Sequence, residues 1–531
     1  MKKATKFVVF PAIASVLLWS AGSTVLAVDR SMLTVPKRTQ GLALSAAAAG
    51  QADAPVLISA QKGQARTVAR AVTKLGGTVT TLLTDADFLT ARIPAAKLTE
   101  LERHTAVRAL GIDRPVRLDP AAMQPLEEKS QAVPSASDPA LSLKITRGEI
   151  RAPQFAQATG GTDGTGVTVA ILDTGVDPQH PALLTTSTGD AKIIDWQDFT
   201  GEGDVETKET RTEPVAGIVS LSGTYRLGTF KETQIPEGEM GSDINRNGKK
   251  DDTFAVLVTD AAQKGVYDTV YLDLNGNGNF AEEQPLGAYN KTRTVGLFGS
   301  AEVKEGVQQG VNFVVTRINA DGSGINLGYD GGQHGTHVAG ITAGTGPVTG
   351  IAPGAKIMAI KVLTSGGSGG WDGIIKGMEY AASHGAQVIN MSLGGLGELN
   401  DGNDPQSLLI RDLSEKYGSL FSIAAGNSGP GLNTMGMPGV AGAAITSGAF
   451  ISSNTYKADY GLNVPQDGLW YFSSAGPRDD GGLKPNIVAP GTANAPIPTW
   501  AGQYAVFQGT SMAAPQTSGA AALLVGQAQK T

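Results

Sequence analysis

Three side chains in this sequence have the types that nucleophilic catalysis needs. Ser511 follows a Gly-Thr turn and precedes a run of small and apolar residues, so we expect it at the start of a helix, where the dipole favours negative charge. A serine hydroxyl becomes a good nucleophile when a neutral imidazole takes its proton. His334, in the segment 334–337 (HGTH), is a candidate for that base. Asp173 ends the apolar run 167–172 and is a candidate to orient the imidazole.

Each of these residues alone also has an ordinary structural explanation. Ser511 would cap a helix and Asp173 would form a turn after its strand. His334 would be a structural histidine, or half of a metal site with His337. No third metal ligand lies nearby in the sequence, so the metal interpretation is weak.

Taken together, the three segments resemble the signatures of the subtilisin-like serine peptidases (subtilases). The segments are 173–175 (DTG), 334–337 (HGTH) and 509–515 (GTSMAAP), and they occur in that family's order of Asp, His and Ser. The resemblance implies that Ser511 attacks a peptide carbonyl and forms an acyl-enzyme. It also implies that His334 transfers the proton while Asp173 orients it.

Further segments match the family's transition-state and substrate contacts. Asn427 follows an apolar strand, and by resemblance its amide donates to the oxyanion together with the backbone N–H of Ser511. Alone, this Gly-Asn-Ser-Gly segment would be a plain turn. The resemblance also implies that an extended peptide lies between two backbone segments as an added strand, with glycines permitting close approach. The residues implied in substrate binding are Gly367, Ser368, Gly369, Ser392, Leu393, Gly394, Ala425 and Gly426.

The elements that must position these residues follow an α/β pattern. Apolar strands are expected at 356–363, 387–393, 420–425 and 443–449, and helices at 338–343, 371–384, 406–417 and 511–527. This alternation predicts a parallel sheet with helices on both faces. Catalytic groups at strand ends and a helix start fit the rule that sites lie at the carboxyl edge of such sheets. We expect this peptidase domain to span 145–531.

Composition excludes several kinds of chemistry. The chain has no cysteine, which excludes disulfides, a thiol nucleophile and thiolate metal sites. Its net charge of -7 over 531 residues is mild, and no long basic stretch occurs. We therefore expect polypeptide substrates and no nucleic-acid partner.

The first residues have the pattern of a secretory signal. Lysines precede an apolar run at 7–18, and small residues at 25–27 offer a cleavage site. The apolar run is short for a membrane span, although a retained membrane anchor is the alternative. We expect a signal peptide at 1–27, a secreted, extracellular protein, and no membrane partner after signal removal.

A small domain is expected between the signal and the peptidase. Residues 55–118 show the order β-α-β-β-α-β, which is typical of a ferredoxin-like domain and resembles the inhibitory prosegment of subtilases. An unrelated small domain is the alternative. The Ala-rich stretch 28–54 is expected to be disordered, and 119–144 to be a linker. We predict a zymogen that cuts itself between about 119 and 151.

The stretch between Asp173 and His334 is longer than in simple family members. Residues 187–330 are therefore expected to form a β-rich inserted domain, which resembles the large-insert branch that includes pyrolysin and tripeptidyl peptidase II. Two of its loops have oxygen-bearing side chains at positions 1, 3 and 5 and Gly at 6, as calcium loops do, but no Glu at 12. Hairpin turns are the alternative. The predicted ligands are Asp243, Asn245, Asn247 and Asp251, then Asp273, Asn275, Asn277 and Glu283.

These observations favour a secreted serine endopeptidase that needs no cofactor for catalysis and holds structural calcium. One alternative is an exopeptidase that releases short peptides from free N-termini, which requires carboxylates of the insert to face the substrate's amino group. Another is a non-catalytic, calcium-dependent surface protein, which predicts damage to the triad or Asn427. The chain ends at Thr531, where family members usually continue, so we expect a piece of a longer protein or an unusual end.

Overall fold

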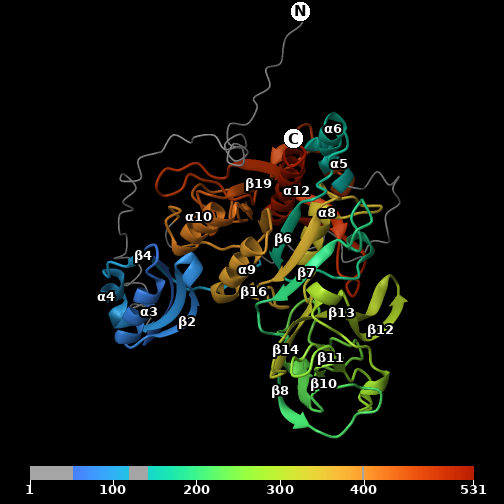
Figure 1. Cartoon of the computed structure of the whole chain (residues 1–531). Coiled ribbons are helices and arrows are strands. Elements are labelled where there is room, and N and C mark those ends of the chain that lie inside the picture. The colour runs from blue at the N-terminus through green and yellow to red at the C-terminus, as the bar shows by residue number, and fades with distance from the viewer. Residues whose placement is uncertain (1–51, 119–141, 398–399) are drawn as a thin grey trace, which may run out of the picture.

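The computed structural model describes residues 52–118, 142–397 and 400–531. Figure 1 shows a small N-terminal α+β domain, a central α/β domain and a domain inserted into the central one. The predicted signal peptide, and nearly all of the stretches 28–54 and 119–144, lie outside the described residues. None of the helices in the described ranges combines the length and the apolar character that crossing a bilayer requires.

A mainly parallel sheet forms the central domain. Its strand order is β20-β19-β18-β17-β6-β15-β7, with β21 beside β19, and every pairing except β19 with β20 is parallel. The strands are β6 (Thr168–Asp173), β7 (Ile193–Asp198), β15 (Lys356–Lys361), β17 (Val388–Met391), β18 (Leu420–Ala424), β19 (Ile445–Ile451), β20 (Gly468–Leu469) and β21 (Ile487–Pro490). Because β6 lies inside the sheet, Asp173 at its end stands at the carboxyl edge.

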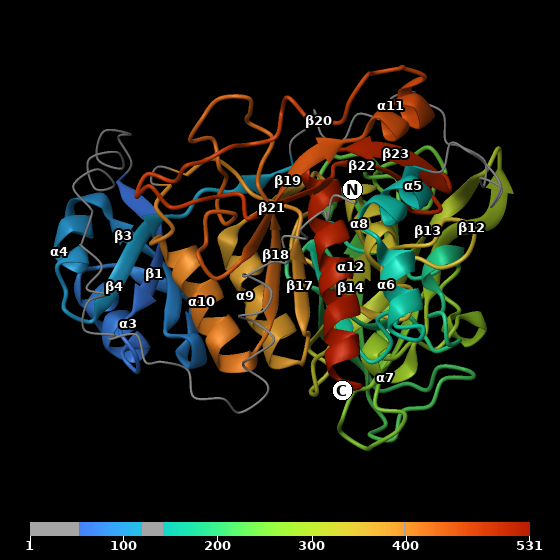
Figure 2. The ribbon, with the colours of Figure 1, turned by 90° about the horizontal axis from the view of Figure 1, so that it is seen from above.

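Helices cover both faces of this sheet, as predicted. The helices α8 (His334–Ala343) and α12 (Thr510–Ala528) cover one face, and α9 (Trp371–Ser383) and α10 (Pro405–Tyr417) cover the other (Figure 2). Alternate residues of β6 divide between the two cores: Ile171 packs in the cluster that contains α8 and α12, and Leu172 in the cluster that contains α9 and α10. The fold is therefore the predicted doubly covered α/β architecture.

Helix α8 begins at His334, four residues before the predicted start at 338. The prediction was late because Gly335 and Thr336 have low intrinsic helix propensity. Tertiary contact overrides that preference: a Cβ at Gly335 would lie 2.0 Å from the carbonyl oxygen of Gly175, so glycine lets the helix start pack directly on the end of β6. This close approach brings His334 to Asp173.

The inserted domain is an antiparallel seven-stranded sheet in the order β11-β10-β9-β8-β14-β13-β12. Its core contains the packed rings of Phe230, Phe254, Phe298 and Phe313. The elements are β8 (Asp204–Arg211), β9 (Tyr225–Lys231), β10 (Thr253–Thr259), β11 (Thr269–Leu272), α7 (Tyr289–Thr292), β12 (Gly296–Lys304), β13 (Val307–Ile318) and β14 (Gly324–Tyr329).

The predicted start of the insertion at 187 was too early. Residues 193–198 form β7, which pairs in parallel with β15 and therefore belongs to the central sheet. The added sheet starts at β8, at Asp204. The apolar run that forms β7 is too short to distinguish a central strand from a strand of the insert by sequence.

The N-terminal domain has the predicted element order. Its sheet order is β2-β3-β1-β4. The elements are β1 (Asp53–Ala60), α3 (Ala65–Lys74), β2 (Thr78–Leu83), β3 (Phe88–Pro94), α4 (Leu98–Glu102), β4 (Val107–Ile112) and the separate short strand β5 (Val116–Arg117). Strand β1 starts inside the stretch that was expected to be disordered up to 54, because Asp53 pairs with Pro94 and Ala54 is buried.

The N-terminal domain packs on helices α9 and α10 of the central domain (Figure 1). Leu57 and Phe88 of its sheet belong to the same buried cluster as Leu409 of α10. At the rim, Arg108 makes an ion pair with Asp412 at 2.7 Å. The contact therefore combines an apolar centre with a polar edge, as protein interfaces do.

Several elements were not predicted from the sequence. They are α5 (Ser142–Glu149), α11 (Ser453–Tyr460), β16 (Ser368–Gly369), β22 (Thr492–Pro496) and β23 (Tyr504–Gln508). Helix α6 (Ala152–Ala158) follows α5. Helix α5 begins inside the predicted linker 119–144. Leu143 is fully buried in the central core, so the linker ends before it.

Candidate active site

Asp173 and His334 form a buried pair at the carboxyl edge of the sheet. The Nδ1 of His334 lies 2.8 Å and 2.9 Å from the two carboxylate oxygens of Asp173. The two side chains are 1% and 0% exposed. Because Nδ1–H donates to the carboxylate, the neutral ring leaves Nε2 without a proton and able to act as a base.

Opposing effects act on the pKa of His334. Burial of the ring lowers the pKa, but the charge of Asp173 and its hydrogen bond raise it, and the carboxylates of Glu239 and Asp330 raise it further. The net result is a pKa above the ordinary histidine value. The imidazolium that forms during catalysis is therefore stabilised by the surrounding charges.

Ser511 lies in the first turn of α12, next to the end of β17. Its Oγ donates to the carbonyl oxygen of Ser392 at 3.2 Å. The Nε2 of His334 is buried and accepts no hydrogen bond from the described residues. The serine side chain must therefore turn toward the imidazole before it can lose its proton. Catalytic hydrogen bonds are often long or unformed in the absence of substrate.

Asn427 is held against the serine-bearing helix by its side-chain oxygen. The Oδ1 of Asn427 accepts from the backbone N–H and the hydroxyl of Thr510, both at 2.9 Å. The Thr510 hydroxyl in turn accepts from the N–H of Gly426 at 3.1 Å. Because the amide oxygen is occupied, the NH₂ group of Asn427 remains to donate to a negative charge beside Ser511.

The predicted substrate-binding residues Gly367, Ser368 and Gly369 form what we call the first substrate wall. This wall is paired with the chain's own N-terminal region. Strand β16 pairs antiparallel with β5, Ser368 opposite Arg117 and Gly369 opposite Val116. The N–H of Leu118 donates to the carbonyl oxygen of Gly367 at 2.8 Å. An extended segment therefore lies along this wall as an added strand.

The other predicted substrate residues flank Ser511 at the ends of β17 and β18. The hydroxyl of Ser392 donates to the carbonyl oxygen of Ser511 at 2.8 Å. Leu393 is buried, and a Cβ at Gly394 would lie 2.6 Å from the carbonyl oxygen of Met437, so glycine is required there. Ala425 is also buried and donates to the carbonyl oxygen of Ser447 at 3.0 Å. The structure thus brings all of the predicted catalytic and substrate residues to one edge.

A comparison with known protein families matches residues 164–531 to the subtilase family, which is more than half of the chain. The chain belongs to the subtilase family. The subtilase is 36% identical over 579 aligned positions to pyrolysin of Pyrococcus furiosus, with 93% of this chain and 40% of that protein covered. It is 30% identical over 469 positions to tripeptidyl-peptidase 2 of Oryza sativa subsp. japonica, with 72% and 34% covered.

Among solved structures, the crystal structure of tripeptidyl peptidase 2 (TPP II) matches with a TM-score of 0.53 and 23% identity, over 71% of this chain and 34% of that chain. This match shows a shared fold. The subtilase spans less than half the length of these relatives. The predicted resemblance to the large-insert branch of serine-type peptidases is confirmed.

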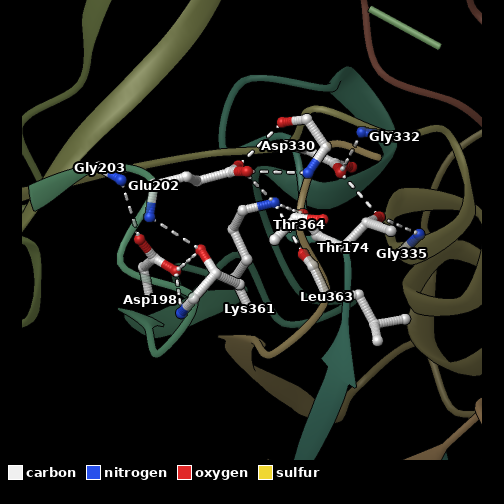
Figure 3. Close-up of polar contacts among 12 residues, drawn as sticks. Thr174, Asp198, Glu202, Gly203, Asp330, Gly332, Gly335, Lys361, Leu363 and Thr364 are labelled. Atoms are coloured by element: carbon white, nitrogen blue, oxygen red, sulfur yellow. Dashed lines mark hydrogen bonds and ion pairs between the residues drawn. The ribbon is translucent and has the colours of Figure 1, made fainter. Parts of the chain in front are cut away.

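A buried polar network that includes Thr174 and Gly335, the residues after Asp173 and His334, was not predicted (Figure 3). The Nζ of Lys361 donates to the carbonyl oxygens of Thr174 at 2.6 Å and Leu363 at 2.9 Å, and forms an ion pair with Glu202 at 2.9 Å. Glu202 also accepts from the N–H of Ser365 at 2.9 Å and its hydroxyl at 2.8 Å. Glu202, just before the first strand of the inserted domain, is thereby connected through Lys361 to Thr174. It is also connected directly to Ser365 in the loop before β16. The sequence feature that could have indicated this network is a lysine at the end of an apolar strand.

Asp330 links the segment that carries Asp173 to the segment that carries His334. It accepts from the hydroxyl of Thr174 at 3.0 Å and from that of Thr336. The Thr174 hydroxyl accepts from the N–H of Gly335 at 3.0 Å. Burial raises the pKa of Asp330 to about 7, against the lowering effect of these hydrogen bonds. The end of β6 and the start of α8 are therefore fixed to one another by side chains next to Asp173 and His334.

The first predicted calcium loop has an ordered arrangement that is held by hydrogen bonds within the loop. Asp243 accepts from the N–H groups of Asn247 at 3.0 Å and of Gly248 at 2.8 Å. The side-chain amides of Asn245 and Asn247 donate to Asp252 and not to the predicted Asp251. The carboxylate that faces the loop is therefore at its tenth position.

The second loop repeats this arrangement. Asp273 accepts from the N–H groups of Asn277 at 3.1 Å and of Gly278 at 2.8 Å. The amides of Asn275 and Asn277 donate to Glu282, again at the tenth position, while the predicted Glu283 accepts from the N–H of Leu274 at 3.1 Å. The described residues contain no cluster of three or more His, Cys, Asp or Glu side chains that would hold a metal ion. Many of the oxygen-bearing side chains in these loops are asparagines.

We expect Asn427→Ala to lower kcat strongly with little change in KM, because its amide is aimed at charge that exists only in the transition state. Loss of such a donor in a family member lowers kcat by about 100- to 1,000-fold. Steady-state kinetics on a peptide substrate would measure this. Asn454→Ala, an exposed position on α11, is the control. Equal kcat values for the two variants would contradict the assignment.

We expect kcat/KM to rise with pH through a pKa above the ordinary histidine value of 6.5, since protonated His334 cannot accept the serine proton. In Glu239→Gln this rising limb of the pH profile should move to lower pH, because one charge that raises the pKa of His334 is gone. The pH profile of kcat/KM is the measurement. A limb at or below 6.5 in the wild type would refute this.

Proposed function

We propose that this subtilase is a secreted endopeptidase that hydrolyses peptide bonds through an acyl-enzyme. The observation that carries the proposal is the buried Asp173–His334 pair beside Ser511, with the amide of Asn427 free to donate. Ser511 attacks the carbonyl while His334 accepts its proton, and the oxyanion is held by Asn427 and the N–H of Ser511. His334 then protonates the leaving amine, and water hydrolyses the ester by the same route in reverse.

The path of β5 favours action on internal bonds over removal of N-terminal peptides. Residues 116–118 lie on the first substrate wall and continue a folded domain on their N-terminal side. A polypeptide that extends beyond the wall in this direction therefore fits the site. An exopeptidase needs a group that blocks this path and binds a free amino terminus. Peptides with free and blocked N-termini would separate the two activities.

We further propose that the N-terminal domain is an inhibitory prosegment. The wall that β16 offers to a substrate is already hydrogen-bonded to β5, so a substrate strand cannot occupy it at the same time. The domain also packs on α9 and α10 through an apolar contact that ends in the Arg108–Asp412 ion pair. Cutting between about 119 and 151 would leave this domain bound by noncovalent contacts alone.

Ser511→Ala should abolish both self-cleavage and labelling by a fluorophosphonate probe, because each requires the activated hydroxyl. Mass spectrometry of the secreted wild-type protein should show loss of the N-terminal region with a cut between about 119 and 151. The Ser511→Ala protein should lose the signal peptide alone. Labelling of a fully unprocessed wild-type chain would sink the zymogen proposal, and an unlabelled, processed and folded wild type would favour the non-catalytic surface protein.

We also propose that the two loops of the inserted domain bind structural calcium. The ligands would be Asp243, Asn245, Asn247 and Asp252 in the first loop and Asp273, Asn275, Asn277 and Glu282 in the second. In both loops the carboxylate at position 1 accepts from backbone N–H groups, and the carboxylate at position 10 accepts from the asparagine side chains. Hard oxygen ligands of this kind suit calcium. Catalysis by Ser511 itself needs no metal.

Calcium at about 100 times its Kd should stabilise the protein by about 2.7 kcal/mol per site and raise its melting temperature. Asp273→Ala should reduce this calcium-dependent increase, whereas Asp251→Ala should not, because Asp251 is exposed and the asparagine amides of its loop contact Asp252 instead. Thermal melting with and without a chelator, together with metal analysis, would check this. An unchanged melting temperature and no bound metal would exclude the sites.

A further inference from the structure

Glu239 of the inserted domain lies beside the catalytic histidine. Its Oε2 accepts from the N–H of Gln333 at 2.7 Å, and Gln333 directly precedes His334. The side chain of Glu239 is exposed. Among the described residues, no lysine or arginine makes an ion pair with it, whereas its neighbour Glu237 is paired with Lys250 at 3.1 Å. Glu239 therefore places a carboxylate that has no Lys or Arg partner among the described residues at the edge of the active site.

The segment that carries Glu239 is in backbone contact with the first substrate wall. A Cβ at Gly238 would lie 1.9 Å from the carbonyl oxygen of Ser365 and 3.0 Å from the Cα of Gly366. Ser365 and Gly366 come immediately before Gly367. The segment is anchored from the insert, since Ile235 and Met240 are buried in its core. The position of Glu239 relative to the wall is thus fixed by packing on both sides.

A substrate residue passes close to this charge. The N–H of Leu118 bonds to Gly367, and β5 runs antiparallel to β16. A substrate strand that keeps this antiparallel register past the place of Leu118 would run alongside Gly366 and Ser365, toward Gly238 and Glu239. The side chain of Leu118 belongs to the buried cluster that contains Leu363. A residue in the place of Leu118 therefore has an apolar surface below it and an acidic group at its rim.

We propose that Glu239 is a specificity-determining residue that selects substrates with lysine or arginine in the place that Leu118 occupies. The aliphatic stem of such a side chain packs on the surface that receives Leu118, and its charged end reaches the carboxylate of Glu239. This inference rests on the proposed function, because it takes β5 as a stand-in for the bound substrate. It gives the inserted domain a direct part in substrate choice.

The test uses the processed enzyme and peptides in which each position around the cut is varied among Lys, Arg, Leu and Glu. Assays run at a pH above the His334 limb, on peptides with free and with blocked N-termini. The wild type should prefer Lys and Arg at one position before the cut, and less so at high salt. In Glu239→Gln the ratio of kcat/KM for the Lys peptide to that for the Leu peptide should fall about fivefold, the size of a partly exposed ion pair. Glu239→Lys should reverse the preference toward Glu.

Glu237→Gln is the matched control, because Glu237 is exposed, lies two residues away and is already paired with Lys250; its Lys-to-Leu ratio should stay that of the wild type. Two results would overturn the proposal: an unchanged ratio in Glu239→Gln, or an equal loss for all peptides, which would make Glu239 a mere support for Gln333. A basic preference that disappears with blocked N-termini would assign the charge to amino-terminus recognition and also overturn it. Failure of the proposed function would appear differently, as a wild type that cleaves no peptide and binds no fluorophosphonate.

Discussion

The full burial of the Lys361 ammonium group constrains the whole site. Lys361 ends a central strand where no water reaches it, so its charge must be met by protein oxygens. Those oxygens come from the residue after the catalytic aspartate, from the loop before the substrate wall, and from Glu202 at the root of the insert. Removing one partner of such a buried pair typically costs about 3–5 kcal/mol. The oxygens that compensate the charge of Lys361 therefore hold three parts in a fixed arrangement: the end of β6, the loop before β16 and the start of the inserted domain.

The same edge of the sheet serves two kinds of recognition. Backbone groups of β16 pair with the extended segment β5, and backbone pairing of this kind does not depend on the side chains of the added strand. The catalytic groups meet it from the ends of β6, β17 and β18 and from the first turns of α8 and α12. Helix starts and strand ends converge there because parallel strands all place their carboxyl ends on one side.

Sequence reasoning was most successful where chemistry is encoded locally. Asp173, His334, Ser511 and Asn427 each stand in a short motif at the end of a predictable strand or helix, so their common place at the carboxyl edge of the sheet followed from the sequence. The Lys361–Glu202 pair did not, because it joins two segments that only tertiary structure brings together. The contacts of Asp252 and Glu282 with the loop asparagines were missed for another reason. Two acidic residues stand next to each other in both loops, and only the backbone path decides which one contacts the asparagines.

The pairing of β8 with β14 has a consequence for how so large an insertion is tolerated. These are the first and last strands of the inserted sheet, and they are neighbours, with Ile325 opposite Val205. The inserted domain therefore closes its own ends, so that its first and last strands leave and re-enter the central domain side by side. The entropic cost of closing a long loop grows slowly with loop length, and contacts within the insert offset it. Evolution could thus lengthen the chain between aspartate and histidine without pulling the two apart.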